Sequence, residues 1–179
     1  FARIALMLCA MDVGSSFEGM GAAREASFSA YAEPALFLLI GSACAATGMT
    51  SFAGLIGALH STPYYGLIVA PLCVALLILL QAEAARVPVD DPLTHLELTM
   101  IHEVMILDHS GPDLALIELG AFYKLFFYAS FIACLIKPPP LADPVANTLL
   151  FYGLLTLIYV VVGVVESIMA RLKMDLVPK

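Results

Sequence analysis

Residues 64–85 read YYGLIVAPLCVALLILLQAEAA, an apolar stretch whose single charged residue, Glu83, stands near its end. An α-helix rises about 1.5 Å per residue, so this stretch would form a helix of about 33 Å, which exceeds the roughly 30 Å hydrocarbon core of a bilayer. The whole chain has the same character, because 61% of its 179 residues are hydrophobic and 13% are charged, with a mean hydropathy of +0.96. Average soluble domains are about half apolar and about one quarter charged, so this composition predicts an integral membrane protein.

Four stretches are long and apolar enough to be complete spans, and a fifth has the pattern of a span's end. The complete spans are predicted at about 34–49, 64–85, 114–136 and 145–170, and the partial span at 1–11. We expect an all-α, polytopic transmembrane helix bundle in which residues 1–179 form a single membrane domain. Because the chain begins with Phe1 inside an apolar run, without a methionine, we expect a fragment of a longer subunit.

The basic residues are divided unequally between the two sides of the predicted membrane. Successive connections alternate sides, so the loops at 12–33, 86–113 and 171–179 share one side. That side carries Arg24, Arg86, Arg171, Lys173 and Lys179. The opposite loops carry only Lys137, so the positive-inside rule places the first set in the cytoplasm. Most acidic residues lie near the same loops, which favours a docking surface or a proton-collecting surface there.

Several ionisable residues stand inside the predicted spans, where a charge is costly and commonly functional. They are Glu118 and Lys124 in the third complete span and Glu166 in the fourth, while Glu33 begins the first. Glu118 and Lys124 are six residues apart and point to different helix faces, which predicts partners on other helices. The alternative reading is that these residues only hold helices together through polar contacts.

The segment after the second complete span is the richest in candidate residues. Glu83 and Arg86 are three residues apart and can pair on one helix face at the membrane boundary. Residues 94–109 have the pattern of an amphipathic or re-entrant helix, on which Glu97 and Asp108 share an apolar face about 16 Å apart. Burial there favours the protonated carboxylic acid, which suits a proton carrier. If the helix ends before Asp108, this shared face is lost.

The histidine and cysteine patterns do not predict a metal or redox site. His95, His102 and His109 are spaced by seven residues, or about 10.5 Å of helix, whereas a metal ion binds nitrogen at about 2 Å. The cysteines are isolated in apolar runs, unlike those of iron–sulfur and zinc sites: Cys9, Cys44, Cys73 and Cys134. We therefore expect no catalytic, cofactor-binding or metal-binding residue, and the net charge of −7 argues against nucleic acid as a partner.

An ordered set of motifs along the whole chain resembles a known family. The motifs are Phe1-Ala-Arg3, Met11-Asp12-Val-Gly14-Ser-Ser-Phe17, Gly19-Met-Gly21-Ala-Ala-Arg24-Glu25, Glu33-Pro34, Arg86-Val-Pro88-Val-Asp90, Glu97-Leu98, Ser110-Gly111 and Glu166-Ser167-Ile-Met-Ala-Arg171-Leu-Lys173-Met-Asp175. This set resembles the membrane subunit shared by group 4 energy-converting nickel–iron hydrogenases and respiratory complex I. The family includes formate hydrogenlyase subunit 4, hydrogenase-4 component C and the complex I subunit at the quinone site.

The resemblance implies a non-catalytic subunit of an oxidoreductase complex in the prokaryotic cytoplasmic (inner) membrane. Such a subunit anchors a cytoplasmic electron-transfer arm and couples its redox chemistry to the translocation of protons or Na⁺. The arm carries iron–sulfur clusters and, in hydrogenases, the nickel–iron centre. The implied partners are proteins like the hydrogenase large and small subunits, antiporter-like membrane subunits and the lipid bilayer.

The resemblance and the bilayer argument together predict two groups of functional residues. The group expected to conduct protons or couple is Glu33, Glu83, Asp90, Glu97, Asp108, Glu118, Lys124 and Glu166. The group expected to form structural or interface ion pairs is Arg24, Arg86 and Arg171.

The chain also departs from the quinone-linked members of the family. Leu93 and His95 stand where those members carry acidic residues, which favours the hydrogenase branch over quinone binding. Three other functions stay open: a quinone-site subunit of an NADH–quinone oxidoreductase relative, a structural anchor without ion conduction, and a stand-alone secondary ion transporter. The transporter is the least supported, because such folds often contain internal repeats and none is visible here.

Overall fold

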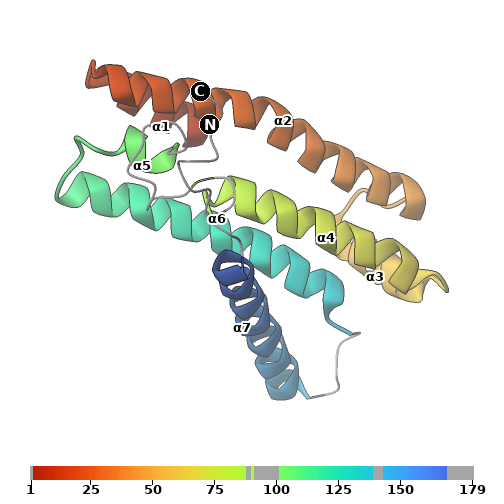
Figure 1. The fold of residues 1–179 in the computed structure, drawn as a ribbon. Helices are drawn as coiled ribbons and strands as arrows, with labels where there is room; N and C mark the ends of the chain where they lie inside the picture. The colour runs from red at the N-terminus through yellow and green to blue at the C-terminus, as the bar shows by residue number, and fades with distance from the viewer. Residues whose placement is uncertain (1, 88–89, 91–100, 139–142, 169–179) are drawn as a thin grey trace.

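The structure is a computed structural model that describes residues 2–87, 90, 101–138 and 143–168, and within these residues it contains helices and no β-strand (Figure 1). The helices are α1 (Ala2–Asp12), α2 (Ser16–Thr47), α3 (Phe52–Ser61), α4 (Tyr65–Glu83), α5 (His102–Met105), α6 (Pro112–Ile136) and α7 (Pro144–Ile168). Four of them, α2, α4, α6 and α7, are long and apolar enough to cross a membrane. The predicted all-α membrane bundle is therefore confirmed.

Helix α2 is longer than the sequence predicts, because it begins at Ser16 and continues through Pro34 to Thr47. Most of the segment expected as a loop at 12–33 is therefore helical. Alanine is the strongest helix former, and Ala22, Ala23, Ala26 and Ala30 outweigh the helix-weakening effect of Gly19 and Gly21. Pro34 removes one backbone hydrogen bond, which transmembrane helices tolerate. The helix ends at Gly48, whose φ of 69° is left-handed, as in a common C-terminal cap.

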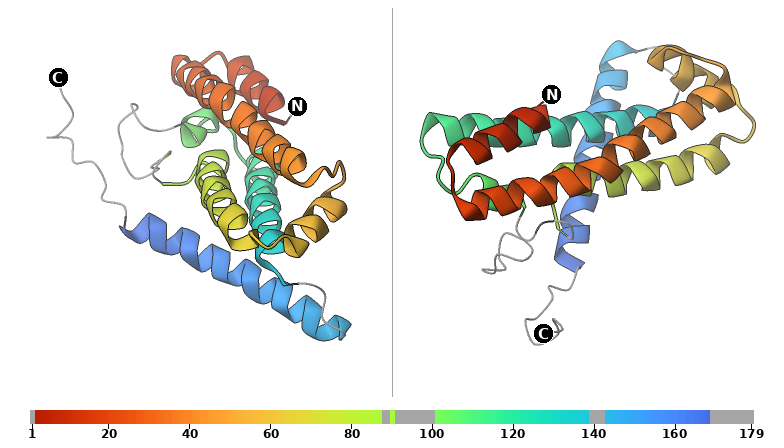
Figure 2. Two further views of the ribbon diagram at one scale, coloured as in Figure 1. Left: turned by 90° about the vertical axis from the view of Figure 1, so that its right-hand side faces the viewer. Right: turned by 90° about the horizontal axis from the view of Figure 1, so that it is seen from above.

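The main apolar core lies between α2, α3, α4, α6 and α7. Its fully buried members include Leu76 and Leu80 on α4 and Ala129 and Ala133 on α6. Alanines four residues apart keep one face of α6 small, which lets α4 pack closely against it. Helix α7 crosses the other long helices obliquely (Figures 1 and 2).

A second, smaller core lies at the end of the bundle where α1, α2 and α5 meet. It contains Ala10, Ala22, Ile101, Met105 and Ile106. Figure 1 places α5 at this end and α3 at the opposite end of the long helices. The two ends of the bundle therefore carry different short helices, and each end has its own set of polar contacts, which are described below.

The helix expected over residues 94–109 is only partly seen. Residues 91–100 lie outside the described part of the chain, and α5 ends at Met105, before Asp108 and His109. The expectation that the helix continues to His109 is wrong, so Asp108 does not belong to an apolar helix face. Gly111 has a φ of 61°, and the left-handed turn there redirects the chain into α6.

Candidate functional site

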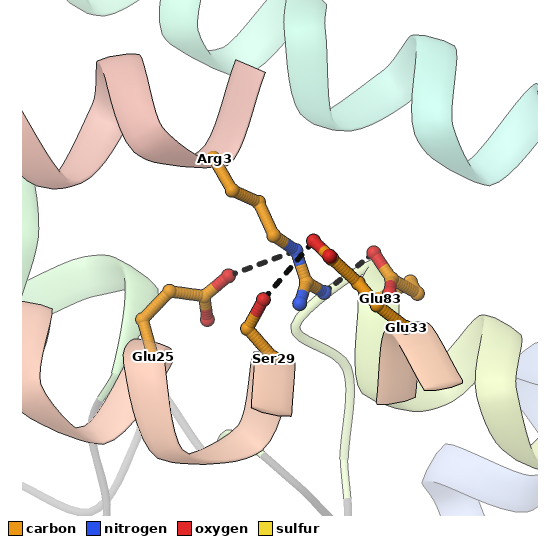
Figure 3. Close-up of polar contacts among 5 residues, drawn as sticks. All are labelled: Arg3, Glu25, Ser29, Glu33 and Glu83. Carbon is orange, nitrogen blue, oxygen red and sulfur yellow. Dashed lines mark hydrogen bonds and ion pairs between the residues drawn. The ribbon is translucent and has the colours of Figure 1, made fainter. Parts of the chain in front are cut away.

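Three helices meet around the side chain of Arg3 (Figure 3). The Arg3 Nε atom lies 3.2 Å from the Glu25 Oε1 atom on α2, and its Nη2 atom lies 2.5 Å from the Glu83 Oε2 atom on α4. All three side chains are almost fully buried, with exposed fractions of 8% to 12%. Arg3 thus joins two carboxylates inside the bundle, one on each side of its guanidinium.

Helix α6 adds two more polar side chains to this cluster. Lys124 interacts electrostatically with Arg3, Glu25 and Glu83. Tyr128, one turn further along α6, makes a side-chain hydrogen bond with Glu83. The cluster therefore draws on α1, α2, α4 and α6, and it balances two carboxylates with two basic groups. We call Arg3, Glu25, Glu83, Lys124 and Tyr128 the charge cluster.

A line of polar side chains extends the charge cluster along α2. Ser29 Oγ donates a hydrogen bond to Glu33 Oε1 at 3.1 Å. Glu25, Ser29 and Glu33 follow each other at intervals of four residues and so lie on one side of the helix, with about 12 Å between the first and the last. Glu33 itself is exposed on the surface of the described part of the chain.

Two further buried carboxylates hold α5 in place. Asp90 accepts hydrogen bonds from the backbone N–H groups of Ile101 and His102, at 3.0 and 2.7 Å. Glu18, on the first turn of α2, accepts a hydrogen bond from the backbone N–H of Asp108 at 3.1 Å. Asp90 is 1% exposed and Glu18 is 0% exposed. The segment that contains α5 is therefore fastened at both ends by carboxylates.

The predicted pair of Glu83 and Arg86 does not form. Glu83 ends α4 and points to Arg3, whereas Arg86 lies 3.9 Å (Nε to Oε1) from Glu166 on α7. The reason is the backbone at Ala85, whose φ of 50° turns the chain out of the helix before Arg86. Arg86 and Glu166 thus connect the end of α4 to α7, as partly exposed groups.

The remaining residues predicted from the sequence lie apart from the charge cluster or outside the described residues. Glu118 is half-buried on α6, Arg24 is half-buried on α2, and the Asp108 side chain is exposed after α5. Glu97 and Arg171 lie outside the described residues.

Several residues of the site belong to neither of the two groups predicted from the sequence. Arg3 was expected only to reach the membrane surface or to line the interior of the bundle, and Glu25 appeared only within a motif. Glu18, Ser29 and Tyr128 were not predicted. One signal was present, because an arginine in the apolar run 1–11 and a glutamate in an alanine-rich helix each need a partner when they are buried.

Metal-binding groups are sparse in the described residues, where no group of three or more histidine, cysteine, aspartate or glutamate side chains could hold a metal ion. His109 uses its Nε2 atom in a contact of 3.1 Å with the Cys9 Sγ atom. The His102 ring lines a cavity of about 840 Å³ between α1 and α6, together with Tyr123, Lys124 and Phe127.

The fold and the charge cluster define a multi-pass membrane protein that buries an ionic network between its spans. A family model described as NADH dehydrogenase matches residues 1–179, and the chain belongs to this family. The chain is also 28% identical, over 187 aligned positions, to formate hydrogenlyase subunit 4 of Escherichia coli (strain K12). The alignment covers 99% of this chain and 59% of that relative, so the chain spans less than two thirds of the relative's length. No significant match was found among solved structures. The family predicted from the motifs is confirmed.

Proposed function

We propose that this chain is a membrane subunit of a hydrogenase-like or complex I-like oxidoreductase, which anchors an iron–sulfur arm and couples its redox chemistry to the translocation of protons or Na⁺. The family and the similarity to formate hydrogenlyase subunit 4 support its place in such a complex. One observation of the structure carries the coupling role: Arg3 bridges two carboxylates that are buried between spans.

Burial of these charges is difficult to explain by stability alone. Taking ions out of water costs several kcal/mol each, and apolar residues of similar volume often replace a buried ion pair without loss. Ionisable groups inside spans usually mark ion pathways. Because arginine stays protonated in proteins, the groups of the cluster that can exchange a proton are Glu25, Glu83 and Lys124. The cluster therefore contains both a fixed charge and titratable neighbours.

The polar side chains on one side of α2 form a line along which protons could be transferred across the membrane. Glu18, Glu25, Ser29 and Glu33 lie on one side of this helix and extend over about 22 Å, most of the roughly 30 Å hydrocarbon core. Glu18 stands at the end of the bundle where α5 docks. In the proposed mechanism, redox events in the arm shift the segment around α5, and this movement changes the contacts of Glu18 and then of Glu25 and Glu83.

The coupling role is tested with the complete complex in proteoliposomes, where electron turnover and ion transport are measured together. Glu83→Gln removes the charge that faces Arg3, and we expect turnover to continue while the number of ions moved per electron falls. Asp113→Asn is the control, because this exposed carboxylate on the first turn of α6 forms no salt bridge with the cluster within the described residues. An unchanged ion-to-electron ratio in Glu83→Gln would instead favour a structural anchor.

The hydrogenase branch is distinguished from the others by purification of the tagged full-length subunit in mild detergent. Partners like the hydrogenase large and small subunits, with stoichiometric nickel, are the expected result in a prokaryotic cytoplasmic membrane. The same arm without nickel would favour a quinone-linked complex. A subunit that purifies alone under verified mild conditions would overturn the proposal and favour a stand-alone transporter.

The quinone-linked function is kept as a second candidate because of the cavity between α1 and α6. It measures about 840 Å³, and its walls are mainly apolar and aromatic, with His102 and Lys124 as polar groups. Ligand sites of this kind combine apolar walls with a few polar groups. Inhibition of turnover by a quinone-site inhibitor would favour this candidate, and full resistance would favour the hydrogenase branch.

A further inference from the structure

His60 makes an unusual pair of contacts at the end of the bundle that carries α3. Its Nδ1 atom lies 2.7 Å from the Ile56 carbonyl oxygen, and its Nε2 atom lies 2.5 Å from the Lys137 carbonyl oxygen. Both partners are carbonyl oxygens, which only accept hydrogen bonds. A neutral imidazole has one N–H group and can satisfy only one of them. Both contacts can be hydrogen bonds at once only if the imidazole is doubly protonated and positively charged.

The surroundings of His60 favour this positive charge. The Lys137 carbonyl lies at the C-terminus of α6, where the helix dipole attracts cations. The ring of Tyr65, from the first turn of α4, lies 4.7 Å from the imidazole ring between centroids, within the range of a cation–π contact. The Tyr65 hydroxyl also donates a hydrogen bond to the Leu135 carbonyl. Side chains of α3 and α4 thus both cap the end of α6.

His60 also lines a cavity of about 470 Å³ together with Lys137. Among the described residues, the other groups in its wall are apolar or neutral, such as Ser61 and the Cys134 thiol, and none of them is acidic. Asp143, further along the chain, is exposed and accepts a hydrogen bond from the backbone N–H of Val145. Lys137 and the His60 ring therefore face one hollow whose described lining contains no acidic residue.

We propose that this cavity binds the headgroup of an anionic phospholipid. Its lining residues come from the short apolar helix α3 and from the end of the spanning helix α6. Figure 1 shows α3 at one end of the long helices, and the ends of spanning helices are the level at which headgroups lie against a membrane protein. Lys137 supplies the mobile ammonium group that contacts the phosphate, as basic side chains at the ends of spans commonly do. His60 keeps its N–H groups on the two carbonyls and contributes its charge. This site is independent of the proposed coupling function.

The site is tested by adding short-chain phosphatidylglycerol or phosphatidylcholine to the purified complex and counting bound lipids by native mass spectrometry. We expect phosphatidylglycerol to bind more tightly than phosphatidylcholine. Lys137→Gln should weaken its binding about fivefold, the usual effect of losing one basic contact, whereas Lys137→Arg should keep it. Equal binding of the two lipids, or equal binding to Lys137→Gln, would overturn the proposal. Inorganic phosphate that displaces phosphatidylglycerol at the same concentration would overturn the lipid assignment.

A substitution isolates the part played by His60. The groups that face His60 are Tyr65 from α4 and Lys137 and Cys134 from the end of α6. His60→Gln replaces the imidazole by a neutral amide that can still donate a hydrogen bond. We therefore expect His60→Gln to bind phosphatidylglycerol more weakly than the wild type at the same pH, with phosphatidylcholine binding unchanged. Equal phosphatidylglycerol binding by His60→Gln and the wild type would contradict a role for His60 in the site.

Discussion

Arg3, near the start of the chain, and Glu83, at the end of α4, form an ion pair of 2.5 Å although 80 residues separate them in sequence. The same guanidinium also pairs with Glu25, so one basic group is shared by two carboxylates. Neither acid has another basic side chain at ion-pair distance within the described residues. This dependence on Arg3 leads to the first prediction.

Replacing Arg3 by methionine should destabilise the protein by about 3–5 kcal/mol, because it leaves two buried carboxylates without their partner. The measurement is thermal unfolding of the purified complex at neutral pH. The triple variant Arg3→Met, Glu25→Gln, Glu83→Gln should recover much of the loss, because neutral amides replace both carboxylates and no buried charge is left without a partner. If Arg3→Met alone melts like the wild type, the cluster contributes little to the fold.

Lys124 should affect coupling more than stability. It interacts with the carboxylates of the cluster electrostatically, and no salt bridge within the described residues includes it. We expect Lys124→Gln to lower the ions moved per electron severalfold while assembly and turnover persist. The comparison is with Lys124→Arg, which keeps the positive charge and should retain most of the coupling. Equal ratios in both variants would exclude a role for this charge.

Gly21 should tolerate no side chain, because α5 packs directly against it. A Cβ atom at Gly21 would lie 3.0 Å from the Met105 Cγ atom and 3.1 Å from the Ile101 carbonyl oxygen. Gly21→Ala should destabilise the protein by about 1–3 kcal/mol, as overpacked contacts do. Gly19→Ala is the matched control on the same helix, since a Cβ there meets nothing within 4 Å and alanine favours the helix. Thermal unfolding of both variants checks this, and a similar loss in the two would contradict the packing argument.

Asp90 should hold the start of α5 through its charge. Asp90→Asn replaces a carboxylate that accepts two backbone hydrogen bonds by an amide that can accept through only one oxygen. Hydrogen bonds to charged groups contribute about 1.5–3 kcal/mol, so the amides of Ile101 and His102 should exchange with deuterium markedly faster. Asp113→Asn, on the exposed first turn of α6, should leave these amides unchanged. Unaltered exchange in Asp90→Asn would show that other contacts hold α5.

The spans and the all-α class could be predicted from the sequence because span length and apolar composition are local quantities. Lys124 and Glu83 could be selected for the same reason, since a single charge in an apolar run is visible without knowing its neighbours. The positions of Glu18 and Gly21 could not be predicted. The contacts of Glu18 and Gly21 are made with α5 and its flanking residues, and this helix of four residues packs against α2 from more than 80 positions away in the sequence.

The sequence by itself determined that this protein is a helical membrane protein of the NADH dehydrogenase family, because apolar length and ordered motifs are read along one dimension. Only the tertiary structure decided which charges meet. It paired Glu83 with Arg3 instead of Arg86, and it continued α2 through Pro34. Ion pairs act over a few ångströms, so their partners are selected by which helices pack together, and packing is not a property of any single segment.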